Sequence, residues 1–547
     1  MIAIGNNKFL GGSWMLKKKR KGLKTTSRAF TLVELLAIIV ILGIILVIAV
    51  PGINHIMDSS KTKLYNVTVD KIISGAKDYI LQNKEEITGL EETGIGYIPL
   101  SEIMEKQFIS DAITNPITKE PFPENAVVKA TKSGENYEYD FLIDGIPNIY
   151  VESKGVNSPK LAKGMTAIKW NGSTWAEVSN PDEDLSWYDY PNKVWGNAKT
   201  ADGSYWVWVP RYAYQISSNY HTSTAGTINI KFLRNNSNVA GDDTTVSLEP
   251  TYSGNSQTNY IKHPAFTFGN VELTGLWIAK FTATAAEGVD EAIPCNGANN
   301  ISTKTPKIIP NAVAWHCVSV HNMFLASRKM ETNNVYGWGT SGSGIDTHMM
   351  KNSEWGAAAY LSKSTYGKEN ERIWINPNSW VITGCAGDSE SALYTYMSTC
   401  LREYHTTNGQ KASTTGNVYG IYDMSGATWE HVAAFTNNMH ASVNGSSIVN
   451  AENKYKDVYN IGSPDNGLNN YALTSNVKGD AIYETSSGGQ GWDAWYATHA
   501  WFVYDQLPWV VRGADFEGGL SASQFAYSRF SGSATLFAGF RPVLVVY

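Results

Sequence analysis

The sequence predicts an α+β protein with a long N-terminal helix, a small mixed segment and a loop-rich C-terminal domain. An uncharged apolar run begins at Leu35 and ends at Val50, and apolar residues then recur at helical spacing to about Asn83. Aromatic residues are frequent, with 18 Trp and 30 Tyr, and the chain contains 48 Gly. This composition is typical of a loop-rich domain held together by aromatic side chains. With 547 residues, the chain is too long for a single domain.

The apolar run, taken with its flanks as residues 30–53, is long enough to cross a hydrocarbon core of about 30 Å. Residues 1–29 contain eight Lys or Arg and no acidic residue, which predicts that they stay in the cytoplasm. The rest of the chain has 36 basic and 50 acidic residues, a net charge of −14, and we therefore expect no nucleic-acid partner. Glu34 is an acid near the N-terminal end of residues 30–53. Placing a carboxylate in or near a membrane costs free energy, which suggests that Glu34 has a function.

The residues around this acid carry a first resemblance. Ala29-Phe30-Thr31-Leu32-Val33-Glu34-Leu35-Leu36 resembles the processing site of type IV prepilins and pseudopilins, although that family usually has Gly where this chain has Ala29. The resemblance implies that a prepilin peptidase cuts before Phe30 and that the new N-terminus is methylated. It also implies that Glu34 pairs with the amine of a neighbouring pilin subunit when membrane-inserted subunits assemble through their N-terminal helices.

Composition and patterning divide the chain into five parts. We expect a leader at 1–29, a transmembrane and stalk helix at 30–83, a small head segment at 84–165, a junction at 166–204 and the C-terminal domain at 205–547. The head segment contains a pattern typical of a hairpin around Ser133-Gly134. In the C-terminal domain only residues 352–367 predict a clear helix.

The four cysteines all lie in the part expected outside the cytoplasm. We expect two disulfides, Cys295 with Cys317 and Cys385 with Cys400, since sequential pairing closes short loops. Metal binding and free thiols are the alternatives, although the chain has no CxxC pair. His316, His321 and the pair Glu430-His431 are further metal-ligand candidates, but they give no complete set.

A second resemblance lies in the C-terminal domain. Residues 417–432, NVYGIYDMSGATWEHV, resemble the signature of the formylglycine-generating-enzyme branch of the C-type-lectin fold. Ser353-Glu354-Trp355 is similar to the Glu-Trp helix of that family, and Gly539-Phe540-Arg541 to its closing residues. The resemblance implies a compact α+β domain with little regular structure.

The chemistry of the enzymes in that branch is not expected here. They need a reactive cysteine pair in the last segment, and residues 511–542 contain no cysteine, so we predict that the chain is not an enzyme. Ser425, Asp423 and His431 lack a nucleophile elbow, and we expect Asp423 and Trp429 to hold the core. The GxGxxG match at 337–342 is interpreted as a loop. We expect no cofactor. The resemblance implies that a structural calcium ion is possible, because relatives bind one near this motif, but Ala427 replaces the Asn that the family has there.

The last segment has a composition typical of binding loops, in which aromatic residues supply contact area and small residues supply fit. The alternative interpretation is a pair of core strands, and Arg512, Gly513, Gly539, Phe540 and Arg541 are expected to be framework. The predicted ligand-binding residues are Asp515, Phe516, Ser521, Tyr527, Ser528, Arg529, Phe530, Thr535, Leu536 and Phe537. Residues 512–541 also resemble the variable segment of target proteins of diversity-generating retroelements. Mutagenesis in those systems yields a restricted set of residues, and Glu517 and Gln524 are not in that set.

These observations predict a pilin-anchored adhesin-like or receptor-like protein that binds an unknown protein or cell-surface ligand. It would lie at the extracellular cell surface, anchored in the inner (cytoplasmic) membrane or incorporated into a pilus. The alternative is a structural minor pilin or pseudopilin whose head caps or spaces the fibre.

Overall fold

The computed structural model describes the chain from residue 64 to residue 547 with short gaps. The gaps are 66, 88–89, 91–93, 111–112, 117–118, 124–125, 134–135, 143–149, 152–153, 180, 182–183, 290–294, 296, 341 and 343. The basic leader, the Ala29–Phe30 processing site, Glu34 and the apolar run therefore lie outside the described residues. None of the helices in the described part is long and apolar enough to cross a membrane.

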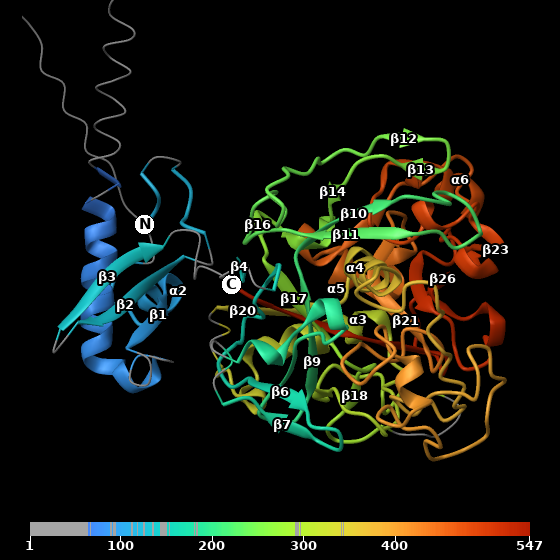
Figure 1. Ribbon diagram of the computed structural model, residues 1–547, viewed down its shortest axis with the longest axis horizontal. Helices are drawn as coiled ribbons and strands as arrows, with labels where there is room; N and C mark the ends of the chain where they lie inside the picture. The colour runs from blue at the N-terminus through green and yellow to red at the C-terminus, as the bar shows by residue number, and fades with distance from the viewer. Residues whose placement is uncertain are drawn as a thin grey trace, which may run out of the picture. The chain divides into compact units, whose positions relative to one another are not determined.

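The described chain is a mixed α+β protein, and its first part contains a helix and a small sheet (Figure 1). Residues 67–83 are helical and lead into a 3-10 turn at Lys84–Glu86. Ile72, Ala76, Tyr79 and Ile80 are buried at the spacing of one helix face, so the predicted amphipathic helix is confirmed over this range. The Tyr79 hydroxyl donates a hydrogen bond of 2.5 Å to Glu102, which lies on the short helix α2.

The small sheet has three antiparallel strands in the order β1-β2-β3. Its elements are β1 (Ile95–Pro99), α2 (Leu100–Glu105), β2 (Val127–Ser133) and β3 (Asn136–Leu142). Ser133 pairs with Asn136 at the end of the β2–β3 ladder, so the hairpin predicted around Ser133-Gly134 is confirmed.

The C-terminal domain contains two seven-stranded sheets (Figure 1). The first is antiparallel, in the order β20-β28-β17-β9-β8-β6-β7. Its strands are β6 (Thr166–Trp170), β7 (Trp175–Glu177), β8 (Asn197–Lys199), β9 (Tyr205–Pro210), β17 (Gly275–Ala279), β20 (Ile345–Met349) and β28 (Pro542–Val546). Residues 166–204, expected to be a junction, thus supply three strands of this sheet, and the domain begins earlier than expected. These strands are too short for their alternation to stand out among Asp, Pro and Asn turns.

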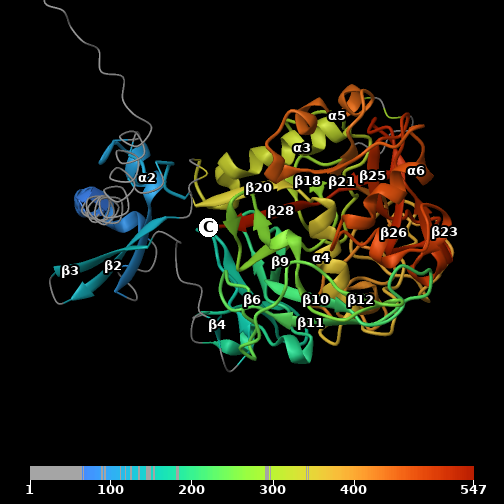
Figure 2. The same cartoon turned by 90° about the horizontal axis from the view of Figure 1, so that it is seen from above.

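The second sheet contains most of the terminal segment. Its order is β22-β21-β25-β26-β24-β23, and β27 pairs with β21. The strands are β21 (Trp429–Thr436), β22 (Asp457–Tyr459), β23 (Gln490–Ala494), β24 (Thr498–Trp501), β25 (Trp509–Gly513), β26 (Ser523–Phe530) and β27 (Ala538–Phe540). Strand β26 is therefore an inner strand between β25 and β24, and Figure 2 shows it near β25.

Short elements complete the domain. The predicted helix at 352–367 is confirmed as α4 (Asn352–Lys363), whereas the sequence analysis did not identify α3 (Val320–Lys329), α5 (Ala441–Val449) or α6 (Gly467–Ala472). The remaining strands are β4 (Tyr150–Val151), β5 (Val156–Asn157), β10 (Tyr212–Ile216), β11 (Ile228–Phe232), β12 (Tyr252–Ser253), β13 (Ser256–Gln257), β14 (Ile261–Lys262), β15 (Thr267–Phe268), β16 (Val271–Glu272), β18 (Thr284–Ala285) and β19 (Pro306–Lys307).

Large aromatic side chains fill the core between these short elements. Trp206, Trp208, Trp277, Trp355 and Trp509 are all completely buried. Trp355 on α4 donates from its indole nitrogen to the Gln524 carbonyl at 2.8 Å, which attaches the helix to β26. These tryptophans lie on β9, β17, α4 and β25, so large aromatic side chains pack the short strands and the helix together.

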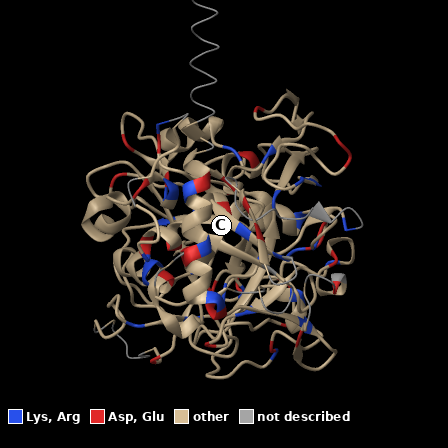
Figure 3. Ribbon diagram, turned by 90° about the vertical axis from the view of Figure 1, so that its left-hand side faces the viewer, with Lys and Arg blue, Asp and Glu red and all other residues tan. Residues whose placement is uncertain are grey.

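Charged residues are distributed rather than clustered. In the view of Figure 3, Lys and Arg positions are interspersed with Asp and Glu positions along the described ribbon. An extended basic face, the electrostatic feature that nucleic-acid binding uses, is not visible among the described residues in this view.

Candidate ligand-binding surface

The framework residues predicted around the terminal segment are buried and hydrogen-bonded. Arg541 forms an ion pair of 2.6 Å with Glu430 and donates to the Ala279 carbonyl at 2.7 Å. Arg512 donates to the carbonyl of Ala481 at 3.0 Å. Both arginines and Phe540 have no exposed surface, so their role as framework is confirmed.

Asp423 also holds the core, as expected. Its buried carboxylate accepts hydrogen bonds from the Gly384 amide at 2.9 Å and from the Asn376 side chain at 2.9 Å. Burial raises the pKa of Asp423 to about 6. In the described part of the chain no hydrogen bond joins Asp423 to His431.

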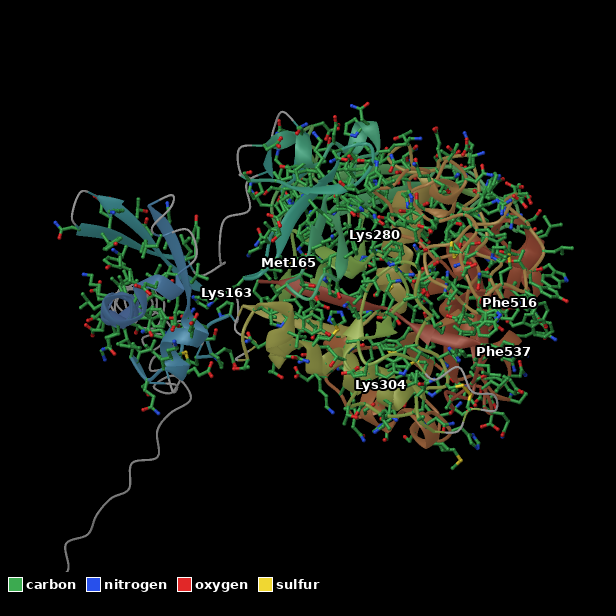
Figure 4. The ribbon with its side chains drawn as sticks, turned by 90° about the horizontal axis from the view of Figure 1, so that it is seen from below. Lys163, Met165, Lys280, Lys304, Phe516 and Phe537 are labelled. Atoms are coloured by element: carbon green, nitrogen blue, oxygen red, sulfur yellow. A yellow bond between two sulfur atoms is a disulfide. The ribbon has the colours of Figure 1, made fainter. Side chains whose placement is uncertain are left out.

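Two loops of the terminal segment are attached to the same short stretch of chain, residues 427–429. The Phe516 amide donates to the Ala427 carbonyl at 3.0 Å, and the Trp429 amide donates to the Phe537 carbonyl at 2.8 Å. Phe516 and Phe537 therefore lie toward the same end of the C-terminal domain (Figure 4). Phe516 is half-buried, and Phe537 is 41% exposed.

A third loop, at 391–396, lies against the first. The ring centroids of Tyr394 and Phe516 are 6.3 Å apart, and those of Tyr394 and Tyr396 are 5.6 Å apart. Tyr396 is 81% exposed and Leu520 is 65% exposed. We call the following set the terminal aromatic surface: Leu393, Tyr394, Tyr396, Phe516, Leu520 and Phe537.

Both expected disulfides are present, and each supports one of these loops. Cys385 pairs with Cys400, and this bond closes the stretch that contains residues 391–396. Cys295 pairs with Cys317, and the Cys317 amide donates to the Thr535 carbonyl at 2.9 Å. The disulfides therefore restrict the loops that present the surface, and they indicate an oxidising compartment.

The sequence analysis missed the contribution of Leu393, Tyr394 and Tyr396. The signal was present, because an LYTY sequence lies between two cysteines that were expected to pair. That sequence marks a constrained aromatic loop but does not fix its exposure, because Trp315 also lies between two paired cysteines and is completely buried.

Most of the other predicted ligand-binding residues are half-buried. Ser521, Ser528, Thr535 and Leu536 are half-buried. Phe530 is also half-buried, with its ring 6.3 Å from Trp429 and 5.8 Å from His431. Arg529 donates to the Phe502 carbonyl at 2.8 Å.

Tyr527 requires a correction, because its side chain is completely buried. Its hydroxyl donates to the Gly488 carbonyl at 2.7 Å and lies 3.1 Å from the Ser486 hydroxyl. Its ring lies 6.4 Å from the ring of Phe502 and 5.7 Å from the Arg512 guanidinium, so this tyrosine is part of the core and not of an exposed surface.

Asp515 is an acid at the edge of the terminal aromatic surface. Burial raises its pKa to about 6, and the nearby charge of Glu517 acts in the same direction. Its carboxylate accepts a hydrogen bond of 3.2 Å from the Glu517 amide. The Asp515 carboxylate therefore loses its negative charge as the pH falls through about 6.

The candidate metal ligands do not converge. Cys317 is in a disulfide, Glu430 pairs with Arg541, and His316 contacts the Ala314 carbonyl at 2.9 Å. Within the described ranges no group of three or more His, Cys, Asp or Glu side chains could hold a metal ion.

Comparison with protein-family models and with curated proteins finds no match for this chain.

Proposed function

We propose that this chain is a surface-displayed binding protein of the adhesin or receptor type. An N-terminal pilin-like helix tethers it, and a C-terminal domain with a C-type-lectin-like fold of the formylglycine-generating-enzyme type binds a protein or cell-surface ligand through the terminal aromatic surface. One observation carries the proposal: exposed apolar side chains from three loops gather above a buried, hydrogen-bonded framework. Contiguous exposed apolar patches mark interaction sites in soluble domains.

The restraints on the three loops favour a binding role for their exposed apolar side chains. Two disulfides and the backbone bonds to residues 427–429 fix the loops before any ligand arrives. A preorganised loop loses less conformational entropy on binding, and tyrosine and phenylalanine supply contact area with few rotatable bonds.

The N-terminal sequence supports the proposal that a pilin-like helix tethers the chain. A prepilin peptidase would cut before Phe30, and the methylated chain would remain in the inner membrane or enter a pilus through contacts of its helix with other pilin subunits. This places the C-terminal domain on the extracellular side, which agrees with its disulfides.

The resemblance to variable proteins of diversity-generating retroelements agrees with the arrangement of the terminal segment. Its framework residues are buried, whereas Leu520 and Phe537 are exposed on loops. Substitutions at exposed loop positions usually change stability by less than about 0.5 kcal/mol, so such loops tolerate diversification.

An attachment assay with cells that display the full chain tests the proposal. The test variant combines Tyr396→Ser, Leu520→Ser and Phe537→Ser, and the control variant combines Leu248→Ser and Val335→Ser, which change residues that are 57% and 49% exposed. We expect the test variant to lose attachment to its target cells while the control retains it.

The same variants address the second candidate function, a minor pilin or pseudopilin that caps or spaces the fibre. In that case the apolar residues contact other subunits. The test variant would then reduce the amount of assembled fibre and leave attachment per fibre unchanged.

A further inference from the structure

A groove with a volume of about 560 Å³ lies beside the terminal segment but is formed by other residues. Its lining includes Glu371, Arg372, Trp374, Glu390, Lys411 and Tyr496. Arg372 connects the groove to the terminal segment, because it donates hydrogen bonds of 2.8 Å to the carbonyls of Leu520 and Ala522. Small-ligand sites in proteins have volumes of about 300–1,000 Å³, so the groove could hold one or two small rings.

Two cationic side chains in the groove form cation–π contacts with aromatic rings. The Lys411 ammonium lies 4.3 Å from the centre of the Trp374 ring, and the Arg372 guanidinium lies 5.2 Å from the centre of the Tyr496 ring. In the part of the chain that the structure describes, neither cation has a carboxylate within ion-pair distance, and Arg372 Nε has no hydrogen-bond partner. Arg372 is only 9% exposed, so its charge is poorly compensated by water. An anionic ligand group would supply the ion-pair partner that both cations lack among the described residues.

Two carboxylates at the rim restrict the kind of anion. Glu371 and Glu390 are both exposed, and Glu371 also pairs with Lys368 at 3.0 Å. Ionised carboxylates accept hydrogen bonds and donate none. They therefore favour a ligand with hydroxyl donors, and their charge opposes a segment with several acidic side chains more strongly than a group with a single carboxylate.

Tyr496 adds a sign of strain at the same place. Its φ angle is +66°, in the left-handed region that bulky residues rarely adopt, and its hydroxyl has no hydrogen-bond partner among the described residues. Residues held in such conformations cluster at binding and active sites.

We propose that this groove is a second binding site, for a saccharide unit that carries a carboxylate. Arg372 and Lys411 bind the carboxylate, and Glu371 and Glu390 accept hydrogen bonds from ring hydroxyls. This site does not depend on the proposed function of the terminal aromatic surface, which is formed by different side chains.

Calorimetric titration of the full chain in detergent tests this site with three probes. D-glucuronate has both required groups, D-glucose lacks the carboxylate and acetate lacks the ring. We expect D-glucuronate to bind with a dissociation constant of about 1 mM and the other two to bind at least about tenfold more weakly, since each loses one set of charge-assisted hydrogen bonds.

Substitutions of Lys411 assign the binding to the groove. Lys411→Gln should weaken D-glucuronate binding about tenfold, whereas Lys411→Arg, which keeps the charge and can stack on Trp374, should stay within about threefold. Lys199→Gln is the matched control, because Lys199 also lies over an aromatic ring, 4.4 Å from the centre of Tyr205. It should bind D-glucuronate like the unchanged chain.

Three results would overturn the proposal. Equal binding of acetate would show a simple anion site, and tighter binding of a tri-glutamate peptide would show a peptide site. Equal D-glucuronate binding by the unchanged chain and by Lys411→Gln, with both variants folded by their melting curves, would place the saccharide elsewhere.

Discussion

Glu484 is buried in the C-terminal domain, where three groups donate hydrogen bonds to its carboxylate. The hydroxyls of Tyr214 and Tyr360 donate to it at 2.9 and 2.8 Å, and the Gly479 amide donates at 2.6 Å. Burial raises the pKa of Glu484 to about 7, and it raises the pKa of Asp480 to about 6. The folded state therefore holds protons that the unfolded chain releases at lower pH.

This difference predicts that the domain becomes less stable as the pH rises from 5 to 8. The folded-state pKa of Glu484 lies above its usual value of 4.5, so stability is lost between that value and about 7. We expect the free energy of unfolding to fall by about 1–3 kcal/mol over this range. Melting curves at several pH values measure it.

The variant Glu484→Gln should flatten this dependence, since an amide does not titrate there. Glu369→Gln, a change at an exposed residue, is the control and should leave the dependence as it is. An equally steep dependence in both variants would mean that other groups cause it.

Tyr527 gives a second prediction about a single residue. Tyr527→Phe leaves the Gly488 carbonyl without its 2.7 Å donor and should lower the free energy of unfolding by about 1–2 kcal/mol. Attachment to the target should not change at a temperature where the variant is folded. Loss of attachment without loss of stability would return Tyr527 to the binding surface.

Sequence analysis identified the framework residues better than the exposed ones. Arg512, Asp423, Trp429, Phe540 and Arg541 were expected to be framework, and the structure places all of them in the core. Tyr527 and Phe537 have the same aromatic character in sequence. Their different burial depends on the packing of β26 against segments that are distant in the sequence, and the local sequence does not contain that information.

Among the elements, the loop closed by Cys385 and Cys400 has the clearest functional consequence. The two cysteines are 15 residues apart, and a loop of this length contributes about 3 kcal/mol in the chain-entropy model. The double variant Cys385→Ser and Cys400→Ser should lower the melting temperature and also weaken attachment, because Tyr394 and Tyr396 lose their restraint.

The matched double variant at Cys295 and Cys317 should have a similar effect on stability, and its effect on attachment should arise through the loop at 531–537. Full attachment by both double variants, measured at a temperature where they are folded, would contradict a role of the disulfides in presenting the surface.

Element prediction succeeded where a pattern was long. The helix at 67–83 repeats an apolar spacing over several turns, α4 contains a run of helix-forming residues, and the β2–β3 hairpin has a turn between alternating strands. The strands β6, β7 and β8 have three to five residues each, so they show too few alternations to separate them from loops.

At the scale of the whole molecule, the tether predicts the form of the mature N-terminus. Residues 1–29 should be removed and Phe30 should become an N-methylated terminus. Mass spectrometry of the N-terminal peptide from membranes measures this directly. A peptide that retains Met1 or Met15, or one that begins after Ala49, would contradict pilin-like processing.

The central claim is that the terminal aromatic surface contacts the ligand. Hydroxyl-radical footprinting of the displayed full chain, free and attached to its target, measures the accessibility of each aromatic side chain. We predict protection of Tyr394, Tyr396 and Phe537 on attachment, with no change at Tyr252, which is 43% exposed on β12. Unchanged oxidation of these three residues in the attached state would contradict the account.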